Sequence, residues 1–164
     1  MPVFEIVKGK RWHCGVIARR LRAEQAEASV RFGAQVHRRL VEVFDQSSFC
    51  RAWLIDGRIA GLGGVSGPLA SSTGEIWLAL TEEACRYPVA TVRQALATLH
   101  EIMQLKKKIV TTIFESDVAS KRFALKLGFE ICGDAFEQNG QRLITVSLGE
   151  MHWPSQPYQP SYQH

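Results

Sequence analysis

The side chains that could take a proton from a substrate are carboxylates at the ends of predicted strands. Glu75 stands at the start of one predicted strand, and Glu82 follows the end of the same strand. A carboxylate within hydrogen-bonding reach of an amine or a water molecule can act as its general base. Glu83, Glu115 and Asp117 stand at similar positions. Such residues also serve at surfaces and helix N-termini, so this second role stays open for each of them.

Other catalytic chemistries find little support in the residue pattern. His13, His37 and His100 lie in helical stretches, and no Ser, Cys or Asp stands at a spacing diagnostic of a hydrolase triad. The cysteines are far apart and form no C-x-x-C pair, so neither a zinc site nor a redox motif is indicated. We interpret them as reduced core residues and predict no metal site; they are Cys14, Cys50, Cys85 and Cys132.

The segment 109–129, IVTTIFESDVASKRFALKLGF, must position several of these groups. Its first part is rich in β-branched and aromatic residues, which predicts an interior strand. Its second part predicts a short helix, because Ser116 and Asp117 can accept hydrogen bonds from first-turn amides and apolar residues follow at every fourth position. Gly128 can end this helix, since glycine adopts the left-handed conformation at low cost.

This strand, short helix and Leu-Gly-Phe ending resemble the C-terminal half of GNAT-type N-acyltransferases, whose usual motif reads N-x-x-[AS]-x-x-x-Y-x-x-x-G-F. In this chain Asp117 holds the Asn position, Ser120 the small position and Ala124 the Tyr position. Gly128 and Phe129 match the end of the motif. The framework is kept, whereas the side chains with chemical duties in the family are changed.

The resemblance also implies where a phosphate would bind. In the family, a loop written [QR]-x-x-G-x-[GA] follows the fourth strand, and its successive amides bind the pyrophosphate of acetyl-CoA at the head of the next helix. The corresponding residues 82–91, EEACRYPVAT, contain no glycine, and the two leading carboxylates would repel a diphosphate. A tyrosine usually reprotonates the departing thiolate in the family, and Ala124 cannot do so.

If the chain is active, the resemblance implies acetyl-CoA as its cofactor and Glu75 and Glu82 as the candidate catalytic residues. The candidate cofactor contacts are Leu80, Tyr87, Val89, Ala90 and Asp117. Tyr87 is the one tyrosine near the expected cofactor loop, where it could substitute for the missing acid.

Turn signals divide the rest of the chain. Asp56-Gly57 and Asn139-Gly140 each predict a β-hairpin. Glycines at 61, 63 and 64 weaken the second arm of the first hairpin unless a bulge or a close neighbour uses the missing side chains. The predicted strands are 3–7, 50–55, 58–65, 75–81, 109–114, 130–133 and 142–148. The predicted helices are 12–31 and 34–45, divided near Phe32 and Gly33, then 88 to the lysines at 106–108, and 117–127.

These elements predict an α/β (α+β) fold: a single GNAT-like domain over residues 1–149, with a mixed, mostly antiparallel central sheet of about six to seven strands flanked by helices. With 164 residues, 46% of them hydrophobic, the chain is long enough for one core. It has no apolar run that could span a membrane, and its start lacks the apolar region of a signal peptide. We therefore expect a cytoplasmic protein, in a bacterial host or in a phage particle.

A net charge of +4 permits an acidic partner without identifying one. The basic residues gather in two places. The first is the early helices, with Arg19, Arg20, Arg22, Arg31, Arg38 and Arg39, and the second is Lys106 to Lys108, after a later helix. We interpret them as solvated helix faces or as cations at helix C-termini. No nucleic-acid-binding motif is present, so nucleic acid is not the expected partner.

The composition changes in residues 150–164, which are rich in proline, glutamine and aromatic rings. We expect this tail to contact a protein partner through Trp153, Tyr158 and Tyr162, because prolines lower the entropy cost of docking. A disordered end is the alternative interpretation. A homo-oligomer is also open.

The run Glu75-x-Trp77-Leu78-x-Leu80-Thr81, followed by a helix without the glycine loop, resembles the GNAT-like proteins of tailed bacteriophages related to podophage internal virion proteins. This resemblance implies a GNAT-fold protein with a degenerate acetyl-CoA site that serves as a structural or virion-assembly component. The alternative is an active acetyl-CoA-dependent N-acetyltransferase that acts on a small amine or a protein amino group. A basic nucleic-acid-binding module is a third hypothesis.

Overall fold

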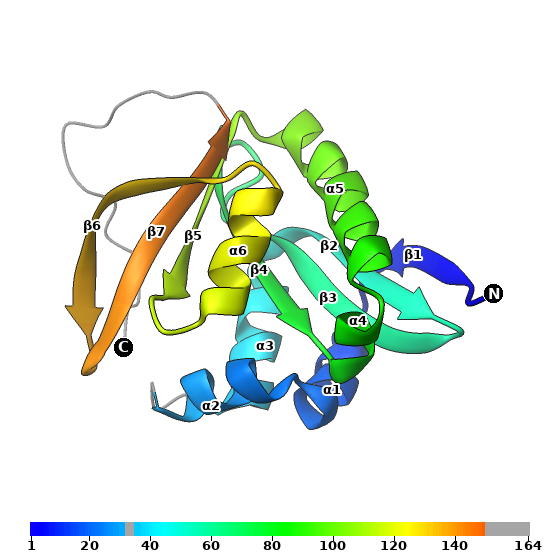
Figure 1. Ribbon diagram of the computed structural model, residues 1–164. Coiled ribbons are helices and arrows are strands. Elements are labelled where there is room, and N and C mark those ends of the chain that lie inside the picture. The colour runs from blue at the N-terminus through cyan, green and yellow to red at the C-terminus, as the bar shows by residue number, and fades with distance from the viewer. Residues whose placement is uncertain (32–34, 150–164) are drawn as a thin grey trace.

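The computed structural model describes residues 1–31 and 35–149 (Figure 1). Two predictions therefore lie outside the described residues: the helix break near Phe32 and Gly33, and the tail with Trp153, Tyr158 and Tyr162. No helix within the described ranges combines the length and the apolar character that a membrane crossing needs.

The described part of the N-terminal region, residues 1–31 and 35–45, holds one strand and three helices. They are β1 (Phe4–Lys8), α1 (Arg11–Arg20), α2 (Ala23–Arg31) and α3 (Val36–Asp45). The single helix predicted over 12–31 is wrong, because it breaks at Leu21 and Arg22. Leu21 forms an isolated antiparallel bridge with Thr81, and the amide of Arg22 donates to the carbonyl of Leu80. Pairing with a distant strand thus overrides the helical composition.

A three-strand meander follows, with β2 (Ser47–Ile55), β3 (Arg58–Ser66) and β4 (Thr73–Leu80). Asp56 and Gly57 have φ of 49° and 73°, as a type I′ turn requires, so the predicted hairpin is confirmed. The glycines of β3 have the predicted close neighbours. A Cβ on Gly64 would collide with the backbone carbonyl oxygen of Phe49, so glycine lets β2 and β3 pair closely there.

The second half of the chain contains α4 (Glu82–Arg86), α5 (Pro88–Leu105), β5 (Lys108–Phe114), α6 (Val118–Lys126), β6 (Glu130–Gln138) and β7 (Gln141–Gly149). The segment 109–129 forms the predicted strand and helix. The carboxylate of Asp117 accepts from the amide of Ser120 and caps α6, and Gly128 follows the helix with φ of 98°. The hairpin at Asn139-Gly140 is also confirmed.

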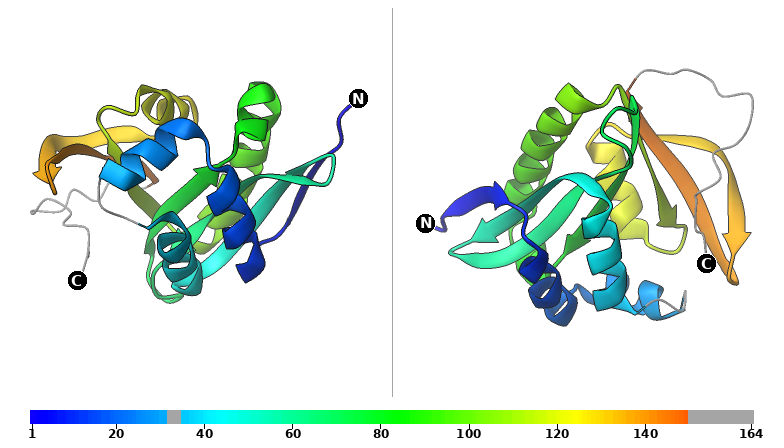
Figure 2. Two further views of the ribbon diagram at one scale, coloured as in Figure 1. Left: turned by 90° about the horizontal axis from the view of Figure 1, so that it is seen from below. Right: turned by 180° about the vertical axis from the view of Figure 1, so that it is seen from behind.

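The strands of the described residues form one seven-stranded sheet in the order β1-β2-β3-β4-β5-β7-β6. Within residues 1–31 and 35–149 only the β4–β5 pair is parallel, so the predicted mixed, mostly antiparallel sheet is confirmed. Helices α5 and α6 cover one face and α1 and α3 cover the other, while α2 crosses near the ends of β4 and α6 (Figure 2). Within the described residues, the helices and the sheet enclose three apolar clusters: one beneath α5 and α6, one beneath α1 and α3, and a third where β2, β3 and β4 pack against α4 and α5.

Two cations that we interpreted as solvated are buried. Lys106 is 2% exposed, and its Nζ donates to the carbonyl oxygens of Pro68 and Ser71, both at 2.7 Å. Arg22 is 4% exposed. Among the cysteines, which are all free, Cys14 is buried in the core as predicted, whereas Cys85 is exposed and corrects that interpretation.

Candidate functional site

The site begins where β4 and β5 separate. Their parallel ladder covers only Thr73–Glu75 opposite Lys108–Val110. Beyond it β4 continues to Leu80 and β5 to Phe114 without pairing to each other. The two central strands therefore diverge, and beyond this ladder their facing edges do not pair with each other.

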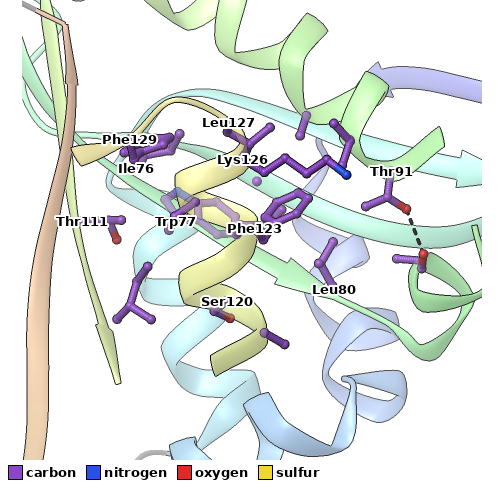
Figure 3. A pocket seen from close by; sticks show the side chains of 18 of the residues that line it. Ile76, Trp77, Leu80, Thr91, Thr111, Ser120, Phe123, Lys126, Leu127 and Phe129 are labelled. Atoms are coloured by element: carbon purple, nitrogen blue, oxygen red, sulfur yellow. Dashed lines mark hydrogen bonds between the residues drawn. The ribbon is translucent and has the colours of Figure 1, made fainter. Parts of the chain in front are cut away.

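A cavity of about 590 Å³ opens at this divergence, between α5 and α6 (Figure 3). Most of its lining is apolar. The side chains that Figure 3 labels are Ile76, Trp77, Leu80, Thr91, Thr111, Ser120, Phe123, Lys126, Leu127 and Phe129. Volume and lining are typical of a pocket for a small molecule or a cofactor.

Two of the predicted site residues line the cavity, Leu80 at the end of β4 and Asp117 at the start of α6. Ala124, which stands at the family's tyrosine position, lines it as well and is 7% exposed. The segment 109–129 therefore supplies one wall of the site, in its strand and in its helix.

The other predicted residues lie outside the lining. Glu75 sits in the β4–β5 ladder opposite Val110, and the carboxylate of Glu82 accepts from the amide of Ala23 at 3.0 Å. Tyr87 packs its ring edge-on against Phe4 on β1, with the ring centroids 5.7 Å apart. The remaining two residues, Val89 and Ala90, lie in the first turn of α5.

Helix α4 follows β4 at the place where the resemblance implies a glycine-rich loop. Its amides are used locally: Ala84 N donates to Thr81 O, and Tyr87 N donates to Ala84 O. The hydroxyl of Thr91 donates to the carbonyl of Ala84 at 2.9 Å and ties α4 to α5 (Figure 3). Pro88 has no amide proton, so the first turn of α5 offers an anion only the amides of Val89 and Ala90.

Two cationic side chains of α6 lie at the cavity and could bind an anion where few free amides are present. Arg122 and Lys126 both line the cavity, and the Lys126 side chain extends from α6 toward α5 (Figure 3). Their charges favour anionic groups at the mouth of the cavity.

The N-terminal end of α6 takes part in a buried ion pair between segments far apart in sequence. The Arg22 guanidinium donates through Nη2 to Asp117 Oδ2 at 3.0 Å and to Ser120 Oγ. The side chains of Arg22 and Asp117 are 5% and 7% exposed. Arg22, Asp117 and Ser120 all line the cavity, so this pair links α2 to α6 across the gap between β4 and β5.

Gln25 of α2 binds the open edge of β4. Its Nε2 donates to the carbonyl of Leu78 at 3.1 Å, and its Oε1 accepts from the amide of Leu80 at 2.9 Å. The Leu80 carbonyl accepts from the amide of Arg22. Part of the strand edge that faces the cavity is therefore already paired.

Cys85 is a further lining residue that the sequence reasoning did not place at the site. Burial raises the pKa of its thiol above the ordinary value, which keeps the group protonated at neutral pH. Arg22 and Gln25 were missed as well, because nothing in their local sequence separates them from solvated helix residues. Among the described residues, no group of three His, Cys, Asp or Glu side chains could hold a metal ion.

These residues fit the parts of acetyl-CoA unequally. The apolar cavity suits a slender apolar arm, and Arg122, Lys126 and the first turn of α5 suit phosphates. The paired edge of β4 leaves less backbone for hydrogen bonds to that arm. The donors that the described residues offer to phosphates are thus the side-chain cations Arg122 and Lys126 and the first turn of α5, in place of a glycine-rich loop.

Comparison with family models and with curated proteins found no match. Solved structures match over most of the chain. One is yncA from Salmonella typhimurium with its cofactor acetyl-CoA, at 15% identity and a TM-score of 0.63 over 92% of this chain and 96% of that one. Another is a GNAT-family acetyltransferase from Bacillus anthracis, at 12% identity and a TM-score of 0.66 over 88% and 93% of the two chains.

A third match is the ribosomal-protein-S5-alanine acetyltransferase from Vibrio fischeri, at 15% identity and a TM-score of 0.63 over 92% of this chain and 95% of that one. At these identities the likeness concerns the fold alone. The chain has the GNAT acetyltransferase fold, with the cavity at the divergence of its two central strands.

Proposed function

We propose that the protein is an acyl-CoA-dependent N-acyltransferase that acts on a primary amine. The observation that carries this proposal is the apolar cavity at the divergence of β4 and β5, with two cations and a helix N-terminus beside it. Bound acetyl-CoA would supply an activated acyl group as a thioester. The match to a GNAT-fold structure solved with acetyl-CoA supports the same proposal.

The described residues can bind the phosphates of the cofactor, keep water away from the reacting centre and give a proton to the departing sulfur. Arg122 and Lys126 hold the phosphates, and side chains such as Leu80 and Phe123 keep water away from the reacting centre. Among the described residues, the lining contains no tyrosine and no histidine. The thiol of Cys85 lies in this lining and is the group that gives a proton to the departing sulfur.

Isothermal titration with acetyl-CoA, combined with a thiol-release assay over a set of amines, tests this proposal. We expect a micromolar dissociation constant and amine-dependent release of CoA. Ala95→Leu fills the cavity from α5 and should abolish binding, whereas Ala97→Leu on the exposed side of the same helix should not. A wild-type protein that shows no binding at millimolar acetyl-CoA would overturn the proposal.

A second candidate is a GNAT-fold protein with a degenerate acetyl-CoA site that serves in assembly. The observation that favours it is the loss of free amides: α4 replaces the loop, and Gln25 pairs the edge of β4. None of the three structures reported above is a bacteriophage protein. This proposal includes a protein partner bound through Trp153, Tyr158 and Tyr162, or a homo-oligomer. It also includes a location in a bacterial cytoplasm or in a phage particle.

Light scattering of the full chain separates the second candidate from the first. Two results together would favour the assembly role. The wild type forms a stable oligomer that is lost in the triple variant Trp153→Ala/Tyr158→Ala/Tyr162→Ala, and titration with acetyl-CoA releases no heat. A monomer that binds acetyl-CoA would exclude this role.

A further inference from the structure

Arg22 carries a hydrogen-bond donor that the described residues leave unused. Its Nε is buried and has no partner within residues 1–31 and 35–149, although the residue is only 4% exposed and lines the cavity. A buried N–H without an acceptor costs free energy, so such donors are uncommon in folded proteins and each calls for an explanation.

The rest of the guanidinium is held firmly. Nη2 donates to Asp117 Oδ2 and to Ser120 Oγ, and Nη1 lies 3.5 Å from the carboxylate of Glu24. Asp117 is itself fixed, because it accepts from the amide and the hydroxyl of Ser120. Nε is thus a preorganised donor at the wall of a largely apolar cavity.

The neighbouring strand edge cannot supply the same donor. The amide of Leu80, which faces the gap at the end of β4, already donates to Gln25 Oε1 at 2.9 Å. A ligand that used this amide would have to displace Gln25 from both Leu80 and Leu78. Arg22 Nε has no acceptor among the described residues, so no hydrogen bond within the protein has to break for it to donate to a ligand.

We propose that Arg22 Nε donates a hydrogen bond to the carbonyl oxygen of the acyl thioester, which makes Arg22 a catalytic residue. This inference rests on the proposed acyl transfer. In that reaction the amine nitrogen bonds to the acyl carbon, the carbon–sulfur bond breaks, and the proton lost by the amine balances the one gained by sulfur. Negative charge grows on the carbonyl oxygen meanwhile, and Nε stabilises it.

The charges around Arg22 favour a carbonyl over an anionic ligand. The guanidinium already lies against the carboxylates of Asp117 and Glu24, so its positive charge is largely neutralised. A neutral oxygen that becomes negative only in the transition state suits such a donor better than a permanent carboxylate does.

The test compares Arg22→Lys, which keeps the charge beside Asp117 but removes Nε, with Arg20→Lys at an exposed position of α1. The first readout is the infrared stretch of acetyl-CoA labelled with carbon-13 at its carbonyl. In the wild type we expect a shift to lower frequency on binding, and in Arg22→Lys we expect that shift to be lost. The second readout is kcat, which should fall roughly 100-fold in Arg22→Lys and stay unchanged in Arg20→Lys.

A third readout needs no substitution at the buried site. The Nε–H resonance of Arg22 in the wild-type protein should shift when acetyl-CoA binds and should not shift with CoA, which lacks the carbonyl. If calorimetry shows binding but the Nε–H resonance shifts with neither ligand, the inference alone is overturned. A carbonyl stretch that shifts as far in folded Arg22→Lys as in the wild type overturns it as well. A wild-type protein that binds neither ligand overturns both the inference and the proposed function.

Discussion

Asp117→Asn should strongly destabilise the protein, because it removes one charge from a buried ion pair. The substitution leaves an oxygen that can still accept from the amide of Ser120, so the cap of α6 is kept. What it takes away is the carboxylate that lies 3.0 Å from Arg22 Nη2. The Arg22 guanidinium, with a side chain that is 5% exposed, then remains buried without its main counter-charge.

The expected loss follows from that burial. Removing one partner of a buried, hydrogen-bonded pair typically costs about 3–5 kcal/mol of unfolding free energy. With a urea m-value of about 2 kcal/mol per M, the midpoint should fall by roughly 1.5–2.5 M. Asp117→Ala should lose about 1 kcal/mol more, because it also removes the helix cap.

Urea unfolding followed by circular dichroism gives these values. The double variant Arg22→Met/Asp117→Asn removes both charges and should be less destabilised than the sum of its single variants by about 2 kcal/mol. Arg142→Gln breaks the shorter pair with Glu115, at 2.6 Å, whose side chains are 56% and 43% exposed, and should hardly move the midpoint. Equal effects of Asp117→Asn and Arg142→Gln would refute the claim that burial sets the strength of the pair.

Three further predictions concern the scaffold. Gly64→Ala should cost about 1–3 kcal/mol, because its methyl group meets the carbonyl of Phe49, whereas Gly15→Ala in α1 has room and should be neutral or stabilising in the same urea assay. Burial lowers the pKa of His13. The wild type should therefore lose stability as the pH falls below about 6.5, because the unfolded chain takes up the proton first. His13→Gln should lose less stability than the wild type between pH 7.5 and 5.5. Burial raises the pKa of Cys50 to about 12. The stability that is present below pH 9 should therefore fall by about 1.4 kcal/mol per pH unit as the pH rises from 9 toward 12. Thermal melts of Cys50→Ser should lack this loss.

Local turn and capping chemistry made much of the fold predictable. Asp56-Gly57 and Asn139-Gly140 specify their hairpins because few residues tolerate positive φ at both turn positions. The segment 109–129 was predictable for the same reason: composition, cap and terminal glycine lie within a few residues of one another. Such signals act over short distances, so the sequence displays them directly.

The wall of the site was not predictable in this way. Arg22 has a buried environment only because Asp117 arrives from 95 positions away, and its local neighbours read as a basic helix surface. Lys106 is buried because carbonyls of the loop at Pro68 and Ser71 surround its ammonium. Gln25 pairs with β4 through a helix break that the composition does not signal. Each depends on tertiary contacts, which periodicity and propensity do not encode.

The short parallel ladder between β4 and β5 also bears on the order in which the chain folds. Strands β2, β3 and β4 follow one another along the chain and pair through short turns, so they can form from local contacts. Joining β5 to β4 requires the whole α5 crossover and is rewarded by only three residue pairs. We therefore expect this seam to close late in folding. The cavity lies along this seam, so we expect the candidate site to form in the last steps that complete the native state.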